Sequence, residues 1–118
     1  MSVSHAAGFA VVDLVLGPAA GVAVRGEVEI ATAPELTAAL DEAIRTTSGP
    51  FVIDLASVGF LDSSGINCLM RARALLGRDD RTLALICPPG STRRVLEIVG
   101  VDELVAIYDT RDALTGSP

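Results

Sequence analysis

The stretch that decides the fold is FVIDLASVGFLDSSGI, residues 51–66. Its first five residues form an apolar run that holds one acid, a pattern typical of a central strand. A second apolar patch covers residues 58–61, and Asp-Ser-Ser-Gly follows at residues 62–65. Apolar residues then recur on one helical face as far as about Leu76, so a helix should follow. The members of that face are Cys68, Leu69, Ala72, Leu75 and Leu76.

Upstream of this stretch, the pattern predicts a hairpin and a helix. Residues 9–16 and 22–28 are rich in β-forming side chains and flank a Gly/Pro turn at residues 17–21. Thr32 and Glu35 form a capping-box pattern at the start of the helix. The apolar face of that helix is Leu36, Ala39, Leu40, Ala43 and Ile44.

Downstream, strands and helices continue to alternate. Residues 82–87 form an apolar run typical of a buried strand, and a Pro-Pro-Gly sequence ends it. Ser91 is the predicted N-cap of a short helix, and Gly100 lies just beyond its end. Residues 104–108 are the last predicted strand.

A final short helix, capped by Asp109 or Thr110, completes the order β-β-α-β-α-β-α-β-α. Alternation after the hairpin predicts an α/β fold with a mostly parallel mixed sheet and helices packed against it. The chain has 118 residues, which suits one domain. We expect residues 1–8 to form a flexible tail and residues 9–118 to form the domain.

Charge and composition exclude several classes of partner. The formal net charge is −6, which argues against binding to nucleic acid or to an anionic membrane surface. The N-terminus lacks the basic segment of a secretory signal, and no apolar run reaches the ~20 residues that span a bilayer. We therefore expect a cytoplasmic protein, with Cys68 and Cys87 as buried free thiols.

The sequence contains few residues that could form a catalytic site. Its single histidine, His5, falls in the expected tail, where it makes a poor partner for a nucleophilic serine. Neither a metal-ligand cluster nor a phosphate-binding loop motif is present. We expect no catalytic activity, no metal and no cofactor.

The segment at residues 62–65 has two interpretations. In the first, Ser63 or Ser64 is only an N-cap that satisfies the free N–H groups of the helix. In the second, an exposed hydroxyl at a helix N-terminus is a phosphorylation site, since the helix dipole favours negative charge there.

Three stretches together resemble the STAS-domain family of bacterial anti-sigma factor antagonists. They are Val52–Leu55 with Val58 and Phe60–Ile66, then Arg25–Glu29 with Ala31–Leu36, and finally Arg94–Leu96 with Gly100–Val101. The resemblance covers nearly the whole chain, from about Phe9 to Leu114. It implies a single STAS domain.

The resemblance also implies a function. Unphosphorylated members bind an anti-sigma factor and release its sigma factor. The anti-sigma factor is commonly a serine-protein kinase that phosphorylates the serine after the motif Asp, here Ser63, with Ser64 as the second choice. A PP2C-type phosphatase reverses the modification.

The chain departs from the family pattern at two positions. Glu29 stands where the pattern has Asp, and Asn67 stands where it has Gly. The predicted partner-binding residues are Glu29, Asp62, Ser63, Ser64, Ile66, Asn67 and Met70. For Ile66 and Met70, burial in the core is the open alternative.

Two other functions remain to be distinguished. STAS-like domains also serve as scaffold subunits of signalling assemblies or accessory subunits of transport complexes. A carrier protein with a phosphopantetheine arm on a helix-start serine is the other alternative, although its pattern is Asp-Ser-Leu in an all-helical domain.

Overall fold

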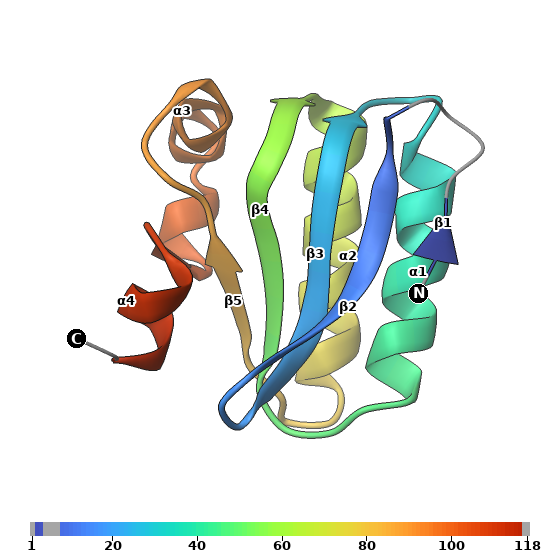
Figure 1. Ribbon diagram of the computed structural model, residues 1–118, viewed down its shortest axis with the longest axis vertical. Helices are drawn as coiled ribbons and strands as arrows, with labels where there is room; N and C mark the ends of the chain where they lie inside the picture. The colour runs from blue at the N-terminus through green and yellow to red at the C-terminus, as the bar shows by residue number, and fades with distance from the viewer. Residues whose placement is uncertain (1, 4–7, 117–118) are drawn as a thin grey trace.

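The computed structural model describes residues 2–3 and 8–116 of the chain. They form a mixed sheet with helices on both faces (Figure 1). The elements are β1 (Ser2–Val3), β2 (Ala10–Leu16), β3 (Ala19–Val28), α1 (Ala33–Arg45), β4 (Phe51–Leu61), α2 (Ser63–Gly77), β5 (Leu83–Ile86), α3 (Ser91–Ile98), the 3₁₀-helix η1 (Val101–Glu103), β6 (Ala106–Tyr108) and α4 (Arg111–Thr115). The predicted order is confirmed, with β1 and η1 added to it.

Within the described residues, the six strands form one sheet in the order β1-β2-β3-β4-β5-β6. The first three strands are antiparallel neighbours, whereas β3 to β6 run parallel. Parallel neighbours need crossover connections, which contain α1, α2 and α3 in turn. The prediction of an α/β fold with a mostly parallel mixed sheet is confirmed.

Helices α1 and α2 pack side by side on one face of the sheet, and α3 packs near β4 at the end of the same layer (Figure 1). The main aliphatic core lies between these helices and the strands. Every residue predicted for the apolar face of α1 is buried. The face predicted for α2 is also buried, except that Leu75 is half-buried.

The opposite face of the sheet carries α4, which lies to the left of β5 in Figure 1. Leu114 of this helix packs against a second, smaller cluster on the strands, formed by Ala19, Val52 and Ile86. Both faces of β4 are therefore covered along its first half, as its run of buried residues requires.

Strand β4 is longer than the sequence indicated. The two apolar segments join into one strand of 11 residues, because pairing with β3 continues between them. The register shifts twice on the way, once between Ala23 and Arg25 and once between Gly26 and Glu27. These irregularities interrupt the alternation of buried and exposed side chains, so the sequence pattern did not indicate one continuous strand.

The capping box predicted at Thr32 is wrong. Thr32 precedes α1 but makes no side-chain cap bond to it. Its hydroxyl donates to the carbonyl oxygen of Glu27 at 2.7 Å and accepts from the backbone N–H of Glu29 at 3.1 Å. The side chain thus stabilises the loop before the helix instead of the helix itself.

The predicted cap at Ser91 is also wrong, because Ser91 is the first residue of α3 and Gly90 precedes it as the cap without a side-chain bond. The cap at Thr110 is confirmed, since its hydroxyl oxygen accepts from the N–H of Ala113 at 3.0 Å. Gly100 follows α3 with a left-handed φ of 82°, as the C-terminal signal predicted.

The expected tail, residues 1–8, differs from the structure in its first part. Ser2–Val3 forms β1, which pairs antiparallel with Ala10 and Val11. Residues 1 and 4–7, including His5, lie outside the described residues. No helix in the described part of the chain has both the length and the apolar character needed to cross a membrane.

Candidate functional site

The start of α2 is fixed by Asp62. The Asp62 backbone is extended, and its N–H donates to the carbonyl oxygen of Val28 at 3.1 Å, which continues the pairing of β3 with β4. The Asp62 carboxylate accepts from the N–H groups of Ser64 at 2.8 Å and Gly65 at 3.3 Å. Asp62, and neither serine, is therefore the N-cap.

This cap leaves Ser63 free. Ser63 is the first residue of α2 and is exposed, and its hydroxyl has no hydrogen-bond partner among the described residues. Ser64 is half-buried and faces a hollow between α1 and α2. Of the two candidate hydroxyls, that of Ser63 is the more accessible to a second protein.

Gly65 allows α2 to begin close to the sheet. A Cβ atom at this position would lie 2.2 Å from Cδ1 of Leu61 and 2.9 Å from Cγ1 of Val28. A side chain fits there only if the side chains of Leu61 and Val28 shift, or if the helix moves away from them. The glycine of the motif therefore sets the distance between Ser63 and the edge of the sheet.

Glu29 lies at the same edge as Asp62. Val28 pairs with Leu61, so the two acids each follow the last paired residue of neighbouring parallel strands. The Glu29 carboxylate accepts from the N–H of Ala31 at 3.2 Å and so is held within its own loop. The two carboxylates make the surroundings of Ser63 acidic.

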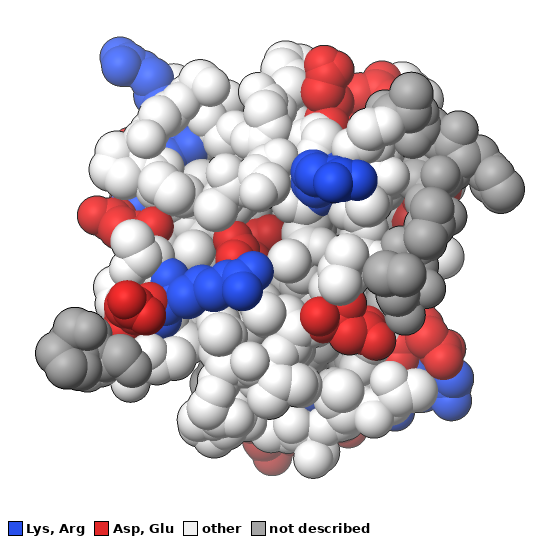
Figure 2. Space-filling model, in the orientation of Figure 1, with Lys and Arg blue, Asp and Glu red and all other residues white. Residues whose placement is uncertain are grey.

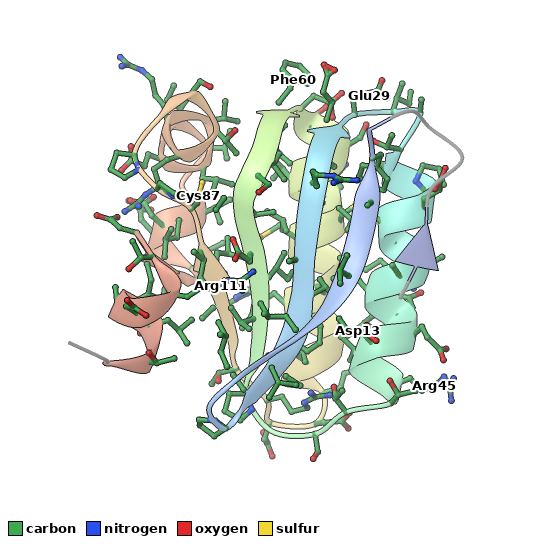
Figure 3. The ribbon with its side chains drawn as sticks, in the orientation of Figure 1. Asp13, Glu29, Arg45, Phe60, Cys87 and Arg111 are labelled. Atoms are coloured by element: carbon green, nitrogen blue, oxygen red, sulfur yellow. The ribbon has the colours of Figure 1, made fainter. Side chains whose placement is uncertain are left out.

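Two apolar residues that the sequence patterns did not single out also lie at this edge. Phe60 is 50% exposed and Ile30 is 77% exposed. Figure 3 shows Phe60 and Glu29 near the same end of the sheet. The cause at Phe60 is a bulge: Gly26 pairs with Val58 but its neighbour pairs with Phe60, so an extra residue turns Phe60 outward.

The hollow between α1 and α2 adjoins this edge. It encloses about 510 Å³, and its lining includes Ile30, Ser64 and Asn67. Arg71 is also part of the lining, and it pairs with Asp41 at 3.0 Å. That hydrogen bond raises the pKa of Arg71 above its ordinary value.

The remaining predicted binding residues divide into two groups. Asn67 is exposed and faces the hollow, together with Ser64. Ile66 and Met70 are half-buried and pack against the main core. The structure therefore gathers Glu29, Asp62, Ser63, Ser64 and Asn67 around one edge, with Phe60 and Ile30 beside them.

Comparison with known proteins relates this arrangement to a family. The family model described as "Mlab, STAS domain" matches residues 16–106. The anti-sigma-F factor antagonist RsfB of Mycobacterium tuberculosis is 32% identical over 92 residues, which are 77% of this chain and 75% of that protein. The anti-sigma-B factor antagonist of Staphylococcus aureus is 26% identical over 88 residues, covering 75% of this chain and 82% of that one.

A solved structure is similar along almost the whole chain. The crystal structure of an anti-sigma factor antagonist from Mycobacterium paratuberculosis superposes with a TM-score of 0.82 at 29% sequence identity. The superposition covers 92% of this chain and 93% of the other.

Proposed function

This chain belongs to the STAS domain family, and from that premise we propose that it is an anti-sigma factor antagonist switched off by phosphorylation of Ser63. Unphosphorylated, it binds an anti-sigma factor in the cytoplasm and so releases a sigma factor. The anti-sigma factor, acting as a serine-protein kinase, phosphorylates Ser63. A PP2C-type phosphatase removes the phosphate.

The observation that carries the proposal is the free Ser63 hydroxyl at the first position of α2. Asp62 already caps the helix, so modification of the Ser63 hydroxyl breaks no hydrogen bond that holds the helix N-terminus. A phosphate there adds a charge of about −1.5 to −2 at the positive end of the helix dipole. The fold should therefore tolerate the modification.

The energy of switching has to come from the interface with the partner. A charge at an exposed helix N-terminus contributes about 0.3–1 kcal/mol. Changing a bound fraction from 99% to 1% requires ~5.5 kcal/mol. Only the desolvation of the phosphate against a partner, together with repulsion between like charges, reaches that scale.

The surroundings of Ser63 fit that mechanism. Phe60 and Ile30 offer exposed apolar area that a partner could cover. Asp62 and Glu29 are acids beside the serine, so a phosphate would be the third negative group at this edge. A partner that covers Phe60 and Ile30 would have to bury this phosphate or give up its contact with them.

The test is a kinase reaction followed by a binding measurement. The protein is incubated with the anti-sigma factor and ATP, and the modified residue is identified by mass spectrometry. Ser63→Ala should abolish modification, whereas Ser64→Ala and the control Ser91→Ala should not. Ser91 is the matched control, because it is also an exposed first residue of a helix. Modification that persists in Ser63→Ala would refute the assignment.

A further inference from the structure

A second hollow lies on the opposite face of the sheet, far along β4 from Ser63. It occupies about 340 Å³ between α4 and the turn that joins β2 to β3. Apolar side chains dominate its walls, and the β4 and β5 residues form its floor. The residues used below are Leu16, Val52, Ala84, Tyr108 and Leu114. We call this hollow the α4 groove.

A guanidinium lies beside the α4 groove, just outside the residues that line it. Arg111 is one helical turn before Leu114 on α4, and its Nε donates to the Asp54 carboxylate at 2.7 Å. Asp54 is two residues after Val52 on the same face of β4, which places the ion pair about 7 Å from the groove floor. Figure 3 shows Arg111 extended over this face of the sheet.

The two members of this ion pair differ in exposure. The Asp54 side chain is 6% exposed, whereas that of Arg111 is 48% exposed. The buried carboxylate also accepts from the N–H of Ala56 at 2.8 Å, so its position is fixed. The terminal nitrogens of Arg111 donate to no acceptor within the described residues and stay available. A second carboxylate can therefore share the guanidinium.

We propose that the α4 groove binds an aliphatic carboxylate, with the alkyl chain over Val52 and Ala84 and the carboxylate on Arg111. The hollow is within the size range of small-molecule sites, its walls are mostly apolar, and Arg111 lies one helical turn from Leu114 in its lining. We take the occupant to be a small anion because the half-exposed charge beside the groove is the guanidinium of Arg111. This binding site is distinct from the edge around Ser63 and does not depend on the proposed function.

The broader face around the groove agrees with this chemistry. Figure 2 shows a surface that is mostly uncharged, with a few basic and acidic groups on it, some of them side by side. Leu14 and Leu16 of β2 continue the apolar area beside Ala19. An alkyl chain placed on this face would cover apolar area of the protein and would remove water from few of its polar groups.

The chain carries its own reporter for the test. Tyr108 lines the groove, and it is the only tyrosine in a chain without tryptophan. The probe is sodium decanoate added to the full chain, with decan-1-ol as the uncharged control of equal length. We expect a saturable change of tyrosine emission with decanoate, and binding at least tenfold weaker with decan-1-ol.

Variants of the ion pair give opposite results and so separate binding from folding. Asp54→Asn removes the carboxylate that competes for Arg111 and should tighten decanoate binding about threefold or more. Adding Arg111→Met to Asp54→Asn should weaken it at least tenfold relative to Asp54→Asn alone. Arg45→Met, at an exposed pair with Glu42, is the control and should change nothing.

Filling the groove tests the apolar part of the site. Ala84→Leu should weaken decanoate binding at least tenfold, and its thermal melting curve shows whether the fold is kept. If that variant does not fold, NMR of the parent protein replaces it. The amide chemical-shift changes caused by decanoate must then fall on α4 and the β2–β3 turn. Three results would overturn the proposal. They are tyrosine emission that does not saturate with decanoate, equal decanoate affinity of Asp54→Asn with and without Arg111→Met, and emission changes that follow dimerisation in sedimentation experiments.

Discussion

Helices α2 and α3 begin in similar ways. Each follows a parallel strand of the sheet, and each has an exposed serine as its first residue. The difference lies in what precedes the serine. Asp62 caps α2 with two hydrogen bonds, whereas Gly90 precedes α3 and supplies no side-chain cap.

The charges around the two serines also differ. Ser63 has the carboxylates of Asp62 and Glu29 at the same edge of the sheet. The hollow beside Ser91 is lined by Arg93 and Arg94, of which Arg93 is paired with acids of its own. A helix N-terminus with an exposed serine is thus common to both, and the Asp62 cap and the neighbouring acids are what distinguish Ser63.

The largest expected effect distinguishes the two serines directly. Ser63→Glu should weaken binding of the anti-sigma factor at least 100-fold, about 2.7 kcal/mol, because a charge is placed in the docking surface. Ser91→Glu should leave the affinity within about twofold. Calorimetric titration of each variant measures both, and circular dichroism should show an unchanged fold. An equal loss in the two variants would mean that total charge, not position, controls binding.

The next effect concerns how closely α2 approaches the sheet. Gly65→Ala should lower the free energy of unfolding by about 2 kcal/mol, because its Cβ would overlap Leu61 and Val28. Gly77→Ala, at the other end of α2, meets no atom within 4 Å and should stabilise by up to about 1 kcal/mol. Urea unfolding measures both values. A small effect at Gly65 would show that the start of α2 can move freely.

The sequence predicted the architecture well because apolar periodicity determines it. The buried face of α1 and the order of the elements follow from local patterns. Of the two interpretations of residues 62–65, the one that makes Ser63 or Ser64 the cap is wrong, since serine and aspartate are about equally good caps and only the backbone shows that Asp62 precedes the helix.

Two features could not be read from local patterns. Phe60 was counted with an apolar patch, and its exposure depends on a bulge against a partner strand more than 30 residues earlier. Asp54 and Arg111 are separated by 57 residues, and their contact depends on which face of the sheet α4 covers. Side-chain partners across the sheet are set by tertiary packing, which propensity does not describe.

A smaller effect tests the cap itself. Asp62→Ala should lower the free energy of unfolding by about 1 kcal/mol, since it leaves the N–H groups of Ser64 and Gly65 without an acceptor. Asp62→Asn should keep most of the stability, because the amide oxygen can accept the same bonds. At α3, which has no side-chain cap to lose, Ser91→Ala should change stability by less than about 0.5 kcal/mol. Thermal unfolding of the three variants compares them.

The smallest effect concerns Cys87, the residue that directly follows β5 on the way to α3. Burial raises the pKa of its thiol above the ordinary value of 9.0, and Arg93 offsets part of that rise. The folded chain therefore keeps this proton to higher pH than the unfolded chain does. Above about pH 9, unfolding releases the proton, so this group makes stability fall as pH rises.

Removing the thiol should remove that part of the pH dependence. In Cys87→Ala, the decline of the free energy of unfolding between about pH 8 and pH 10.5 should be shallower than in the parent. Ile86→Val is the control, because it removes one buried methyl group and no titrating group, and so should lower stability equally at every pH. Parallel slopes for Cys87→Ala and the parent would mean that the segment after β5 opens enough at high pH to hydrate the thiolate, and the burial of Cys87 would then hold only near neutral pH.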